Sequence, residues 1–495
     1  MNLVQEKHLK RLLMDKTIKI HPSDNVEVCL SDVTSNCVTI KQGHKIALVD
    51  IKEGEQIIKY GHPIGHATKD IKKGEHVHSH NMETNLKGSL EYHYDPVNVS
   101  LKPKEKKTFM GYKRKDGRVG IRNEIWVLPL VGCVNDICLE IVNETKEYVK
   151  KYNLDGIYHF PHPYGCSQLG GDLNDTKNIL SDLCKHPNAG GVLCVALGCE
   201  NLTLDLFKET LGKDYDDKIR FLVCQEVEDE KKVAKSLIEE LCKYASTFKR
   251  EVCDTSDLVI GTKCGGSDGL SGITANPVVG RLSDNLVAMG GTSILTEVPE
   301  MFGAETGLLN RCKSEDLFNK AAKMINDFKK YFLDNGQPVG ENPSPGNKEG
   351  GITTLEDKSS GCVQKGGLAP VSGVLLYGER YNTKGLNMLC APGNDLVSST
   401  ALTAAGAQII LFTTGRGTPF SAPAPTVKIS TNTPLYNKKN NWIDFDAGVI
   451  VNGKDIDELA DELMDYVLDV ASGKLTKSEI NNQHGLAIWK SGVTL

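Results

Sequence analysis

From Thr108 onward, continuous runs of apolar, often β-branched residues alternate with segments of helical length and spacing. Such runs are typical of parallel strands covered on both faces, because a strand buried on both sides needs no polar alternation. The pattern therefore predicts an α/β chain with parallel sheets. Strands are expected within Glu124–Leu130, Gly191–Ala196, Phe221–Val223, Leu258–Gly261, Thr292–Thr296, Gly373–Leu376 and Gln408–Thr413, and helices within Asp136–Tyr152, Asp229–Lys243, Glu315–Asn335 and Ile456–Ser472.

The N-terminal part has a different character. Between residues 17 and 85, apolar and polar residues alternate and glycine-bearing turns recur, which indicates a small all-β unit. Two similar turns, DIKEGE and DIKKGE, suggest paired hairpins. Residues 86–107 carry two prolines and a lysine cluster, which predicts a linker. The expected organisation is a β unit over 1–85, the linker over 86–107, a middle α/β domain over 108–248 and a C-terminal α/β domain over 249–495.

Composition narrows the classes of partner. The formal net charge is −6, which argues against a general nucleic-acid or polybasic membrane binder. No apolar run approaches the 18 or so residues of a membrane span, and the charged N-terminus lacks the apolar core of a signal peptide. We therefore expect a cytoplasmic protein whose 15 cysteines stay reduced.

Glycine-rich segments follow several of the predicted strands, at the edge where open parallel sheets bind ligands. In GTKCGGSDGLSG, the amides of Gly265, Gly266 and Ser267 are candidates to hold a carboxylate or phosphate. The alternative is a tight strand-to-helix turn without a ligand. No GK[ST] follows, and no GxGxxG opens any unit, so a nucleotide hydrolase and an NAD-dependent oxidoreductase are disfavoured.

Acidic and sulfur side chains in these segments are candidate metal ligands. Cys264 and Asp268 lie in the first loop, and Glu297 and Glu305 follow the next predicted strand. Carboxylates at a strand end suit a divalent ion or a general base. The alternative for these acids, and for the neighbouring Glu300, is stabilisation of a helix N-terminus.

Histidines and arginines complete the candidate set. HVHSH would place His76, His78 and His80 on one face of a strand, as metal ligands or as an exposed polar face. His162 lies in a constrained loop, HPYGCS, next to Cys166. Three guanidinium groups at a spacing of four suit a carboxylate-bearing ligand, the alternative being a solvated turn; they are Arg114, Arg118 and Arg122.

Nine motifs, in order and over essentially the full length, resemble the altronate/galactarate dehydratase family. They are HPSDNVEV, KYGHPIGHA, HVHSHN, GYKRKDGRVGIRN, HPYGCSQLGGD, GCEN, GTKCGGSDGLSGITANP, TEVPEMFGAE and NPSPGN. The resemblance implies an N-terminal SAF domain of β-clip fold, a middle domain expected to dimerise, and a Rossmann-like C-terminal catalytic domain. It also implies a divalent metal, iron(II) or else manganese(II), and the dehydration of D-altronate to 2-dehydro-3-deoxy-D-gluconate in galacturonate breakdown.

For this reaction we expect the metal near Cys264, Asp268, Glu297 and Glu305. Lys263 or His162 would be the base, and His78 or His80 would protonate the leaving hydroxyl. The arginines and the Gly265–Ser267 loop would bind the sugar acid.

Other functions remain open at this point. The same scaffold would suit galactarate, or a sulfonated hydroxy acid that loses sulfite. An iron–sulfur hydro-lyase would use Cys166, Cys199, Cys264 and Cys362 as ligands. A protein of another class would bind a sugar acid without consuming it.

Overall fold

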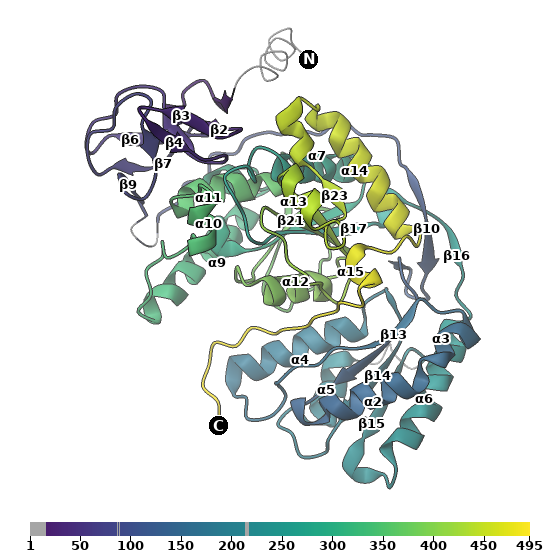
Figure 1. Ribbon diagram of the computed structural model, residues 1–495. Coiled ribbons are helices and arrows are strands. Elements are labelled where there is room, and N and C mark those ends of the chain that lie inside the picture. Colours follow the sequence, from purple (N-terminus) through teal and green to yellow (C-terminus); the bar gives the residue numbers. More distant parts are fainter. Residues whose placement is uncertain (1–15, 87, 89, 213–216) are drawn as a thin grey trace.

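The apolar runs after Thr108 form two separate parallel sheets in a computed structural model of the chain, which describes residues 16–86, 88, 90–212 and 217–495 (Figure 1). The prediction for the N-terminal 15 residues lies outside this range. The predicted α/β class is confirmed, with a C-terminal parallel sheet and a small N-terminal β domain, which is called the SAF domain below after the resemblance given above. None of the described helices is long and apolar enough to cross a membrane.

The C-terminal sheet has seven parallel strands in the order β19-β20-β18-β17-β21-β22-β23. They are β17 (Val259–Cys264), β18 (Thr292–Leu295), β19 (Val371–Leu375), β20 (Gly385–Leu389), β21 (Ile409–Thr414), β22 (Thr426–Ser430) and β23 (Phe445–Asp446). Helices cover both faces, with α7 and α14 packed on one and α12 on the other. The helices are η3 (Thr255–Asp257), α7 (Ala275–Ala288), η4 (Val298–Glu300), α8 (Thr306–Leu309), α9 (Glu315–Asp334), α10 (Pro345–Glu349), α11 (Leu355–Cys362), η5 (Val363–Gly366), α12 (Asp395–Ala404), α13 (Thr433–Lys438), η6 (Gly448–Asn452), α14 (Ile456–Ala471) and α15 (Lys477–Ile480).

The middle domain has a parallel sheet of four strands in the order β13-β12-β14-β15. They are β12 (Glu124–Pro129), β13 (Gly156–His159), β14 (Ala189–Ala196) and β15 (Ile219–Val223). Apolar clusters fill both faces of this sheet, in agreement with the uninterrupted burial of β12 and β14. The helices are η1 (Gly132–Val134), α2 (Asn135–Thr145), α3 (Glu147–Tyr152), α4 (Gly170–Cys184), α5 (Leu204–Leu211), η2 (Cys224–Glu226) and α6 (Glu230–Ala245).

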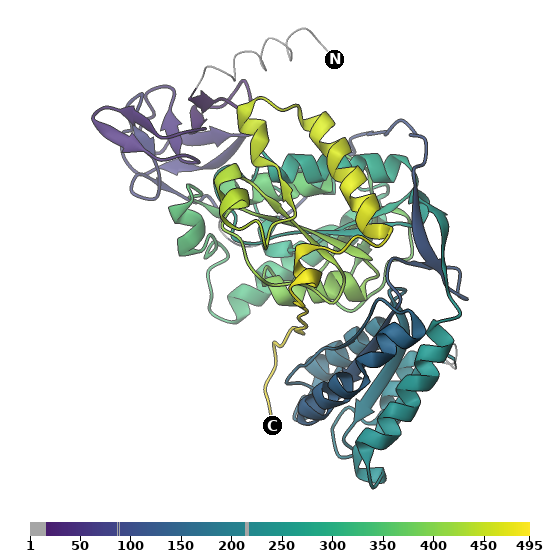
Figure 2. The ribbon, with the colours of Figure 1, turned by 45° about the vertical axis from the view of Figure 1, so that its right-hand side comes forward.

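A narrow neck joins this domain to the rest of the chain (Figure 2). Strand β10 (Thr108–Lys113) leads into the middle domain and β16 (Arg250–Asp254) leads out of it. The two strands pair antiparallel with each other, from Thr108 opposite Asp254 to Tyr112 opposite Arg250. A short strand, β11 (Val119–Gly120), extends this pair to a three-stranded sheet.

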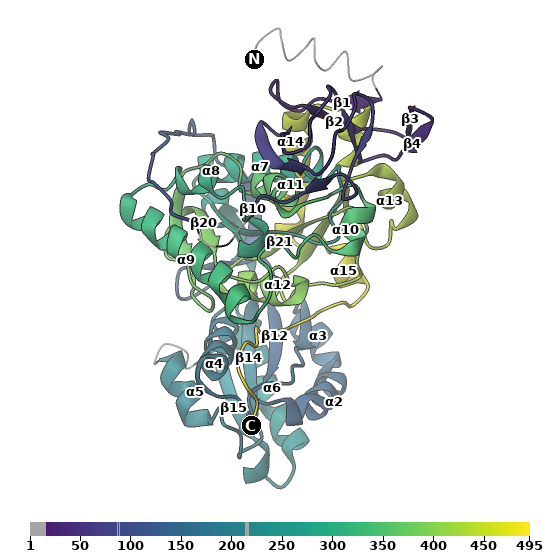
Figure 3. The same ribbon diagram turned by 90° about the vertical axis from the view of Figure 1, so that its left-hand side faces the viewer.

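The SAF domain consists of short antiparallel strands above α10 and α11 (Figure 3). The strands are β1 (Thr17–Ile18), β2 (Val26–Cys29), β3 (Val33–Ser35), β4 (Val38–Ile40), β5 (Lys45–Ala47), β6 (Gln56–Lys59), β7 (His62–Ala67), β8 (His76–Val77) and β9 (Met82–Glu83). The repeated DIK turns face each other, because Lys52 pairs with Asp70 at 2.9 Å and Lys72 pairs with Asp50 at 3.1 Å. The sequence echo is therefore a local twofold arrangement of ion pairs.

The predicted linker has neither helix nor strand in its described residues. It nevertheless packs along the C-terminal domain, where the hydroxyl of Tyr94 donates a hydrogen bond to the carbonyl of Cys312 at 2.7 Å. The path of the chain from the SAF domain to β10 is thus fixed by contacts with the C-terminal domain.

Candidate active site

The candidate site lies at the carboxyl end of β17, a central strand of the C-terminal sheet and the first of its strands along the chain. The chain places β18 on one side of β17 and β21 on the other, so the strand order reverses at this strand. In open α/β sheets such a reversal leaves a crevice for ligands at the carboxyl ends of the strands. The last residues of β17 and the segment after β18, together with α11, η5 and the start of α12, supply the groups described next.

Glu297 is fully buried between two lysines. Its Oε1 lies 2.6 Å from Lys263 Nζ and its Oε2 lies 3.1 Å from Lys365 Nζ. Lys263 also pairs with Asp395, at 2.9 Å. The backbone of Glu297 is left-handed, with φ of 70°, a strained conformation for a residue with a side chain. The surrounding ion pairs hold this conformation in place.

Glu300, three residues on, accepts hydrogen bonds from two thiols. Its Oε2 lies 3.0 Å from Cys264 Sγ and 3.1 Å from Cys362 Sγ, and the two sulfurs are 3.4 Å apart. Its other oxygen lies 2.6 Å from Lys358 Nζ. All four side chains are buried.

The charges of this cluster reinforce one another. Burial by itself raises the pKa of Glu300, but the ammonium groups of Lys358, Lys365 and Lys263 outweigh burial and hold that pKa well below its usual value. Burial likewise lowers the pKa of Lys263, while Glu297 and Asp395 raise it further than burial lowers it. The hydrogen bond with Cys264, together with burial, raises the pKa of Cys362. Near neutral pH, Glu300 is therefore a carboxylate, Lys263 an ammonium and Cys362 a neutral thiol.

Among the described residues, one group of three side chains could hold a metal ion: Cys264, Glu300 and Cys362, whose ligand atoms all lie within 4.8 Å of one another. The thiols of Cys264 and Cys362 each direct a proton at Glu300. A divalent ion that displaced these two protons would leave the net charge of the three side chains unchanged. Two thiolates and one carboxylate suit a transition ion better than Mg²⁺ or Ca²⁺. The donor set therefore fits the divalent transition metal that the motifs imply.

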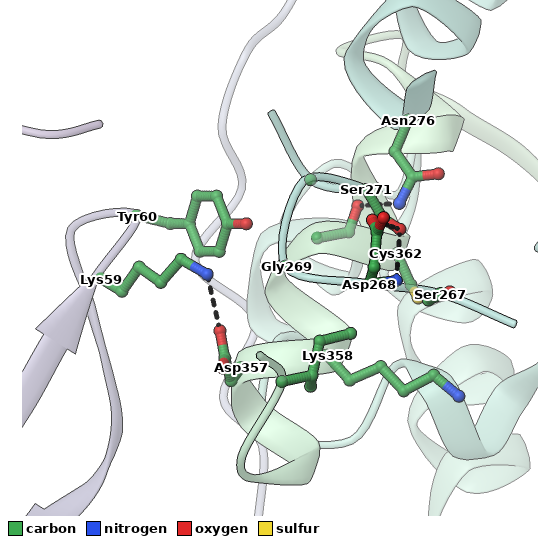
Figure 4. A pocket seen from close by; sticks show the side chains of 13 residues that line it. Lys59, Tyr60, Ser267, Asp268, Gly269, Ser271, Asn276, Asp357, Lys358 and Cys362 are labelled. Carbon is green, nitrogen blue, oxygen red and sulfur yellow. Dashed lines mark hydrogen bonds and ion pairs between the residues drawn. The ribbon is translucent and has the colours of Figure 1, made fainter. Parts of the chain in front are cut away.

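The SAF domain closes this region from the other side (Figure 4). Asp357, on α11, pairs with Lys45 at 2.8 Å and with Lys59 at 2.9 Å, and all three side chains are buried. The next residue, Lys358, points to Glu300 instead. One turn of α11 thus connects the SAF domain to the thiol–carboxylate cluster.

Four histidines of the SAF domain gather above α10. The rings of His44, His76, His78 and His80 lie in contact at centroid distances of 5.1 to 5.4 Å, with the His44–His78 pair stacked and the other pairs tilted. His44 Nε2 donates to the carbonyl of Glu349 at 3.1 Å, and His78 Nε2 donates to that of Lys348 at 2.9 Å. Burial and the neighbouring cations lower the pKa of His78 to about 4, although its bond to Lys348 opposes this. These rings are neutral near pH 7.

Two cavities adjoin the cluster. A small one of about 10 Å³ lies between Tyr60, the Ser267–Gly272 loop and α11. A larger one, of about 520 Å³, extends from Pro299 and Gly393 past Lys348 to an aromatic wall that includes Trp489. The larger cavity has room for a six-carbon acid, and its lining residue Gly393 is close to Glu300, since a Cβ built on Gly393 would lie 3.5 Å from Glu300 Oε1.

Comparison with known proteins agrees with this architecture. Three family models match: the altronate/galactarate dehydratase SAF domain over residues 15–85, the second domain of D-galactarate dehydratase/altronate hydrolase over 111–246, and the D-galactarate/altronate dehydratase C-terminal domain over 255–494. The altronate dehydratase of Bacillus subtilis (strain 168) is 51% identical, covering 97% of this chain and 100% of its own. The Escherichia coli (strain K12) altronate dehydratase is 50% identical, covering 97% and 99%. The galactarate dehydratase (L-threo-forming) of the same strain is 34% identical, covering 95% of each chain.

The chain belongs to the altronate/galactarate dehydratase family. It is therefore a carbon–oxygen lyase of the hydro-lyase class.

In this dehydratase, the predicted metal ligands separate into different places. Cys264 belongs to the metal-binding group, and Glu297 lies beside it but is held by lysines. Asp268 instead accepts hydrogen bonds from its own loop and from Thr431, at 2.8 Å, and Glu305 pairs with Lys329 at 2.7 Å. Neither joins the group of three.

The proposed base residues also change roles. Lys263 is an ammonium held by two carboxylates, so it is a source of positive charge rather than a base. His162 lies in the middle domain, where its Nε2 donates to the carbonyl of Pro129 at 2.7 Å and its Nδ1 accepts from the amide of Tyr164. Both nitrogens of His162 are thus used to shape its loop.

The three arginines support structure and do not reach the site. Arg114 donates to the carbonyls of Pro187 and Arg122. Arg118 pairs with Asp116. Arg122 pairs with Glu479 at 2.7 Å and thereby ties the middle domain to the C-terminal domain. Arg114 and Arg122 thus hold backbone carbonyls in place, whereas Arg118 pairs with a carboxylate of its own turn.

The predicted substrate loop does lie at the site. Gly265 and Gly266 directly follow β17, and a Cβ on Gly265 would come within 2.7 Å of Asp395. Ser267 lines the small cavity, and its buried hydroxyl has no hydrogen-bond partner. An unpaired buried hydroxyl is expensive unless a ligand satisfies it, so Ser267 is a substrate-binding candidate.

From the sequence, Lys358 and Lys365 were not named, Glu300 was mentioned only for a helix N-terminus, and Cys362 was named only as an iron–sulfur ligand. Glu300 has the signature of a helix N-terminal acid, and Cys362, Lys358 and Lys365 lie more than 50 residues further along the chain. The one available signal was the long segment Gly336–Ser360, because long loops in compact domains are often functional. Of the proposed iron–sulfur ligands, Cys264 and Cys362 are buried in the cluster, whereas Cys166 and Cys199 are exposed in the middle domain.

Proposed function

We propose that this enzyme removes water from D-altronate to give 2-dehydro-3-deoxy-D-gluconate, in the catabolism of galacturonate. The observation that carries the proposal is the 50–51% identity to two altronate dehydratases over nearly the whole chain. Galactarate is the second candidate substrate, because the galactarate dehydratase is 34% identical over almost the same length.

The buried lysines suit the electrostatics of this reaction. Removing the proton next to a carboxylate creates an enediolate that carries two negative charges. Lys358 and Lys365 keep their ammonium protons, since nearby carboxylates and thiols raise their pKa values more than burial lowers them. Fixed positive groups in a buried site stabilise developing negative charge with little reorganisation. We assign the same role to Lys263.

Cys264, Glu300 and Cys362 would hold the metal, and iron(II) suits two thiolates better than manganese(II) does. When bound, a divalent ion acts as a Lewis acid toward the carboxylate and hydroxyl of the substrate. Ser267 and the amides of Gly265 and Gly266 would orient the carboxylate.

The proton transfers are assigned to the SAF histidines. His78 is neutral near pH 7 because burial lowers its pKa, so it is suited to take up a proton. Its Nε2 already carries a proton, because it donates to the carbonyl of Lys348, a residue that lines the large cavity. The nitrogen that would take up a proton is therefore Nδ1, which lies 3.0 Å from Ser79 Oγ. His80 is less buried, and its pKa is lowered to a smaller degree, which favours it as the group that returns a proton to the leaving hydroxyl.

An anaerobic assay of D-altronate and galactarate with iron(II), manganese(II) or a chelator tests the proposal, with 2-keto-3-deoxy acids as the readout. Metal-dependent turnover of altronate is the expected result. Glu300→Gln should lower kcat by about 10²–10³-fold and abolish tight metal binding. The matched control is Glu305→Gln, which alters an equally buried carboxylate held by Lys329 and should keep the metal. Turnover of neither acid, or full metal content in Glu300→Gln, would contradict the proposal.

A further inference from the structure

The middle domain places a cysteine after every strand of its parallel sheet. Because the strands are parallel and in register, their carboxyl ends meet at one edge. Each strand is followed within seven residues by a thiol that is exposed or partly exposed, and these are Cys133 after β12, Cys166 after β13, Cys199 after β14 and Cys224 after β15. The catalytic cluster uses none of them.

Hydrogen bonds join the four cysteine-bearing loops into one surface. The amide of Gly132 donates to the carbonyl of Tyr164 at 2.9 Å, which joins the first two loops. The second and third are joined by the amide of Ser167, which donates to Asn201 Oδ1 at 2.7 Å. Gln225 joins the fourth to the third, because its Nε2 donates to Cys199 Sγ at 3.7 Å.

Two buried polar atoms in these loops have no hydrogen-bond partner. Glu200 is 5% exposed, and its Oε2 accepts from the amide of Gly198 while Oε1 has no partner. Gln168 is 3% exposed, and its Oε1 accepts from Gly165 while Nε2 has no partner. Buried polar groups are nearly always satisfied, so an unpaired acceptor and an unpaired donor together point to a missing ligand.

We propose that this edge is a second metal site, which binds iron through the thiolates of Cys133, Cys166, Cys199 and Cys224. Thiolates select soft or borderline ions, and four of them suit one iron(II) ion or an iron–sulfur cluster. Gln168 Nε2 would donate to a ligand sulfur, and Glu200 Oε1 would contact the ion or a further ligand. Each thiol that binds iron releases one proton, so binding of the ion requires no oxidant.

The sulfurs must move to enclose an ion. Among the described residues, only Cys264, Glu300 and Cys362 already offer three ligand atoms within 4.8 Å of one another. Three of the four thiols, those of Cys133, Cys166 and Cys199, are exposed, so their side chains have room to turn toward an ion. Cys224 is half-buried and packs against the apolar cluster of the sheet, so it would remain nearly fixed. The C-terminus borders the same edge, where the amide of Leu495 donates to the carbonyl of Ser167 at 3.0 Å (Figure 1).

The test begins with the metal-free, reduced full-length enzyme, titrated anaerobically with cobalt(II). Bound equivalents are counted by elemental analysis, and thiolate coordination is read from the thiolate-to-cobalt charge-transfer band. We expect two equivalents in the wild type and one in Cys166→Ser/Cys199→Ser, with loss of part of the band. Cys37→Ser is the matched control, since Cys37 is also exposed but lies in the SAF domain. It should retain both equivalents.

Two further measurements complete the design. Iron(II) with and without sulfide, followed by Mössbauer spectroscopy, distinguishes a single ion from a cluster. Circular dichroism should show that the double variant folds, as expected for exposed side chains, and Cys133→Ser offers a second route if it does not. Equal stoichiometry and equal bands in the wild type and these variants would overturn the proposal. Altronate turnover is measured separately, so failure here leaves the proposed function untouched.

Discussion

Asp357 connects the SAF domain to the catalytic body, and replacing it by asparagine isolates that connection. The substitution keeps the shape of the side chain but removes a charge that serves two buried lysines, Lys45 and Lys59. Removing one partner of a buried ion pair costs about 3–5 kcal/mol, because the other charge is left uncompensated. At about 1.36 kcal/mol per factor of ten, docking of the SAF domain should weaken by roughly 10²–10⁴-fold.

The weakening of SAF-domain docking by Asp357→Asn should depend on pH. Burial, only partly offset by Asp357, lowers the pKa of Lys45 to about 8. Lys45 is therefore charged at pH 7 and largely neutral at pH 9 in the wild type. The wild type itself loses part of this ion pair as pH rises through 8, so the penalty of Asp357→Asn should be smaller at pH 9 than at pH 7.

Hydrogen–deuterium exchange measures docking directly, through the protection of the SAF strands and of residues 342–362. Asp70→Asn is the control, since it removes an exposed ion pair with Lys52 in the same domain and should change protection little. Equal exchange in Asp357→Asn and Asp70→Asn would refute the reasoning. A penalty that grows between pH 7 and pH 9 would refute the assigned role of Lys45.

Three further outcomes are expected. Ser267→Ala removes an unpaired buried hydroxyl, so the unfolding free energy should hold or rise while the KM for altronate increases; an unchanged KM would exclude Ser267 from substrate binding. A mild thiol oxidant should join Cys264 to Cys362, whose sulfurs are 3.4 Å apart, and stop turnover until a reductant is added, whereas persistent activity would argue against access to the pair. Burial raises the pKa of Glu124 from 4.5 to about 8, so the folded chain holds an extra proton in this window and stability falls as pH rises through it. When the unfolding free energy is measured with urea at several pH values, Glu124→Gln should flatten its decrease between pH 5 and pH 8. An unchanged decrease would contradict the raised pKa of Glu124.

Much of the fold follows from local pattern. Buried parallel strands such as β14 and β21 have uninterrupted apolar runs and were predicted close to their observed bounds. Strands β20 and β22 were missed because Asn387 and Lys428 interrupt them. Both polar residues are buried in the sheet, but in a linear sequence a polar residue that interrupts an apolar run is typical of a loop.

The site was predicted only in part, because its residues converge through tertiary structure. Cys264 ends a recognisable strand and the Gly265–Ser267 loop follows it, so the strand pattern located both at the carboxyl edge of the sheet. Glu300 and Cys362 meet across 62 residues of sequence, and nothing in their local spacing shows this. For Arg122 the local pattern was misleading. Its regular spacing with Arg114 and Arg118 suggested a ligand site, whereas in the structure Arg122 forms an ion pair with Glu479 that joins two domains.

The paired strands β10 and β16 have an evolutionary consequence. The chain leaves for the middle domain and returns from it at neighbouring positions, Tyr112 and Arg250, which are direct partners across the ladder. The two ends are therefore only about 5 Å apart, a distance that a short hairpin turn can close. The middle domain is therefore an insertion between β10 and β16, two strands that pair directly with each other. Such a junction allows a whole domain to be gained, lost or exchanged in a single genetic event without stretching the sheet that carries the catalytic groups.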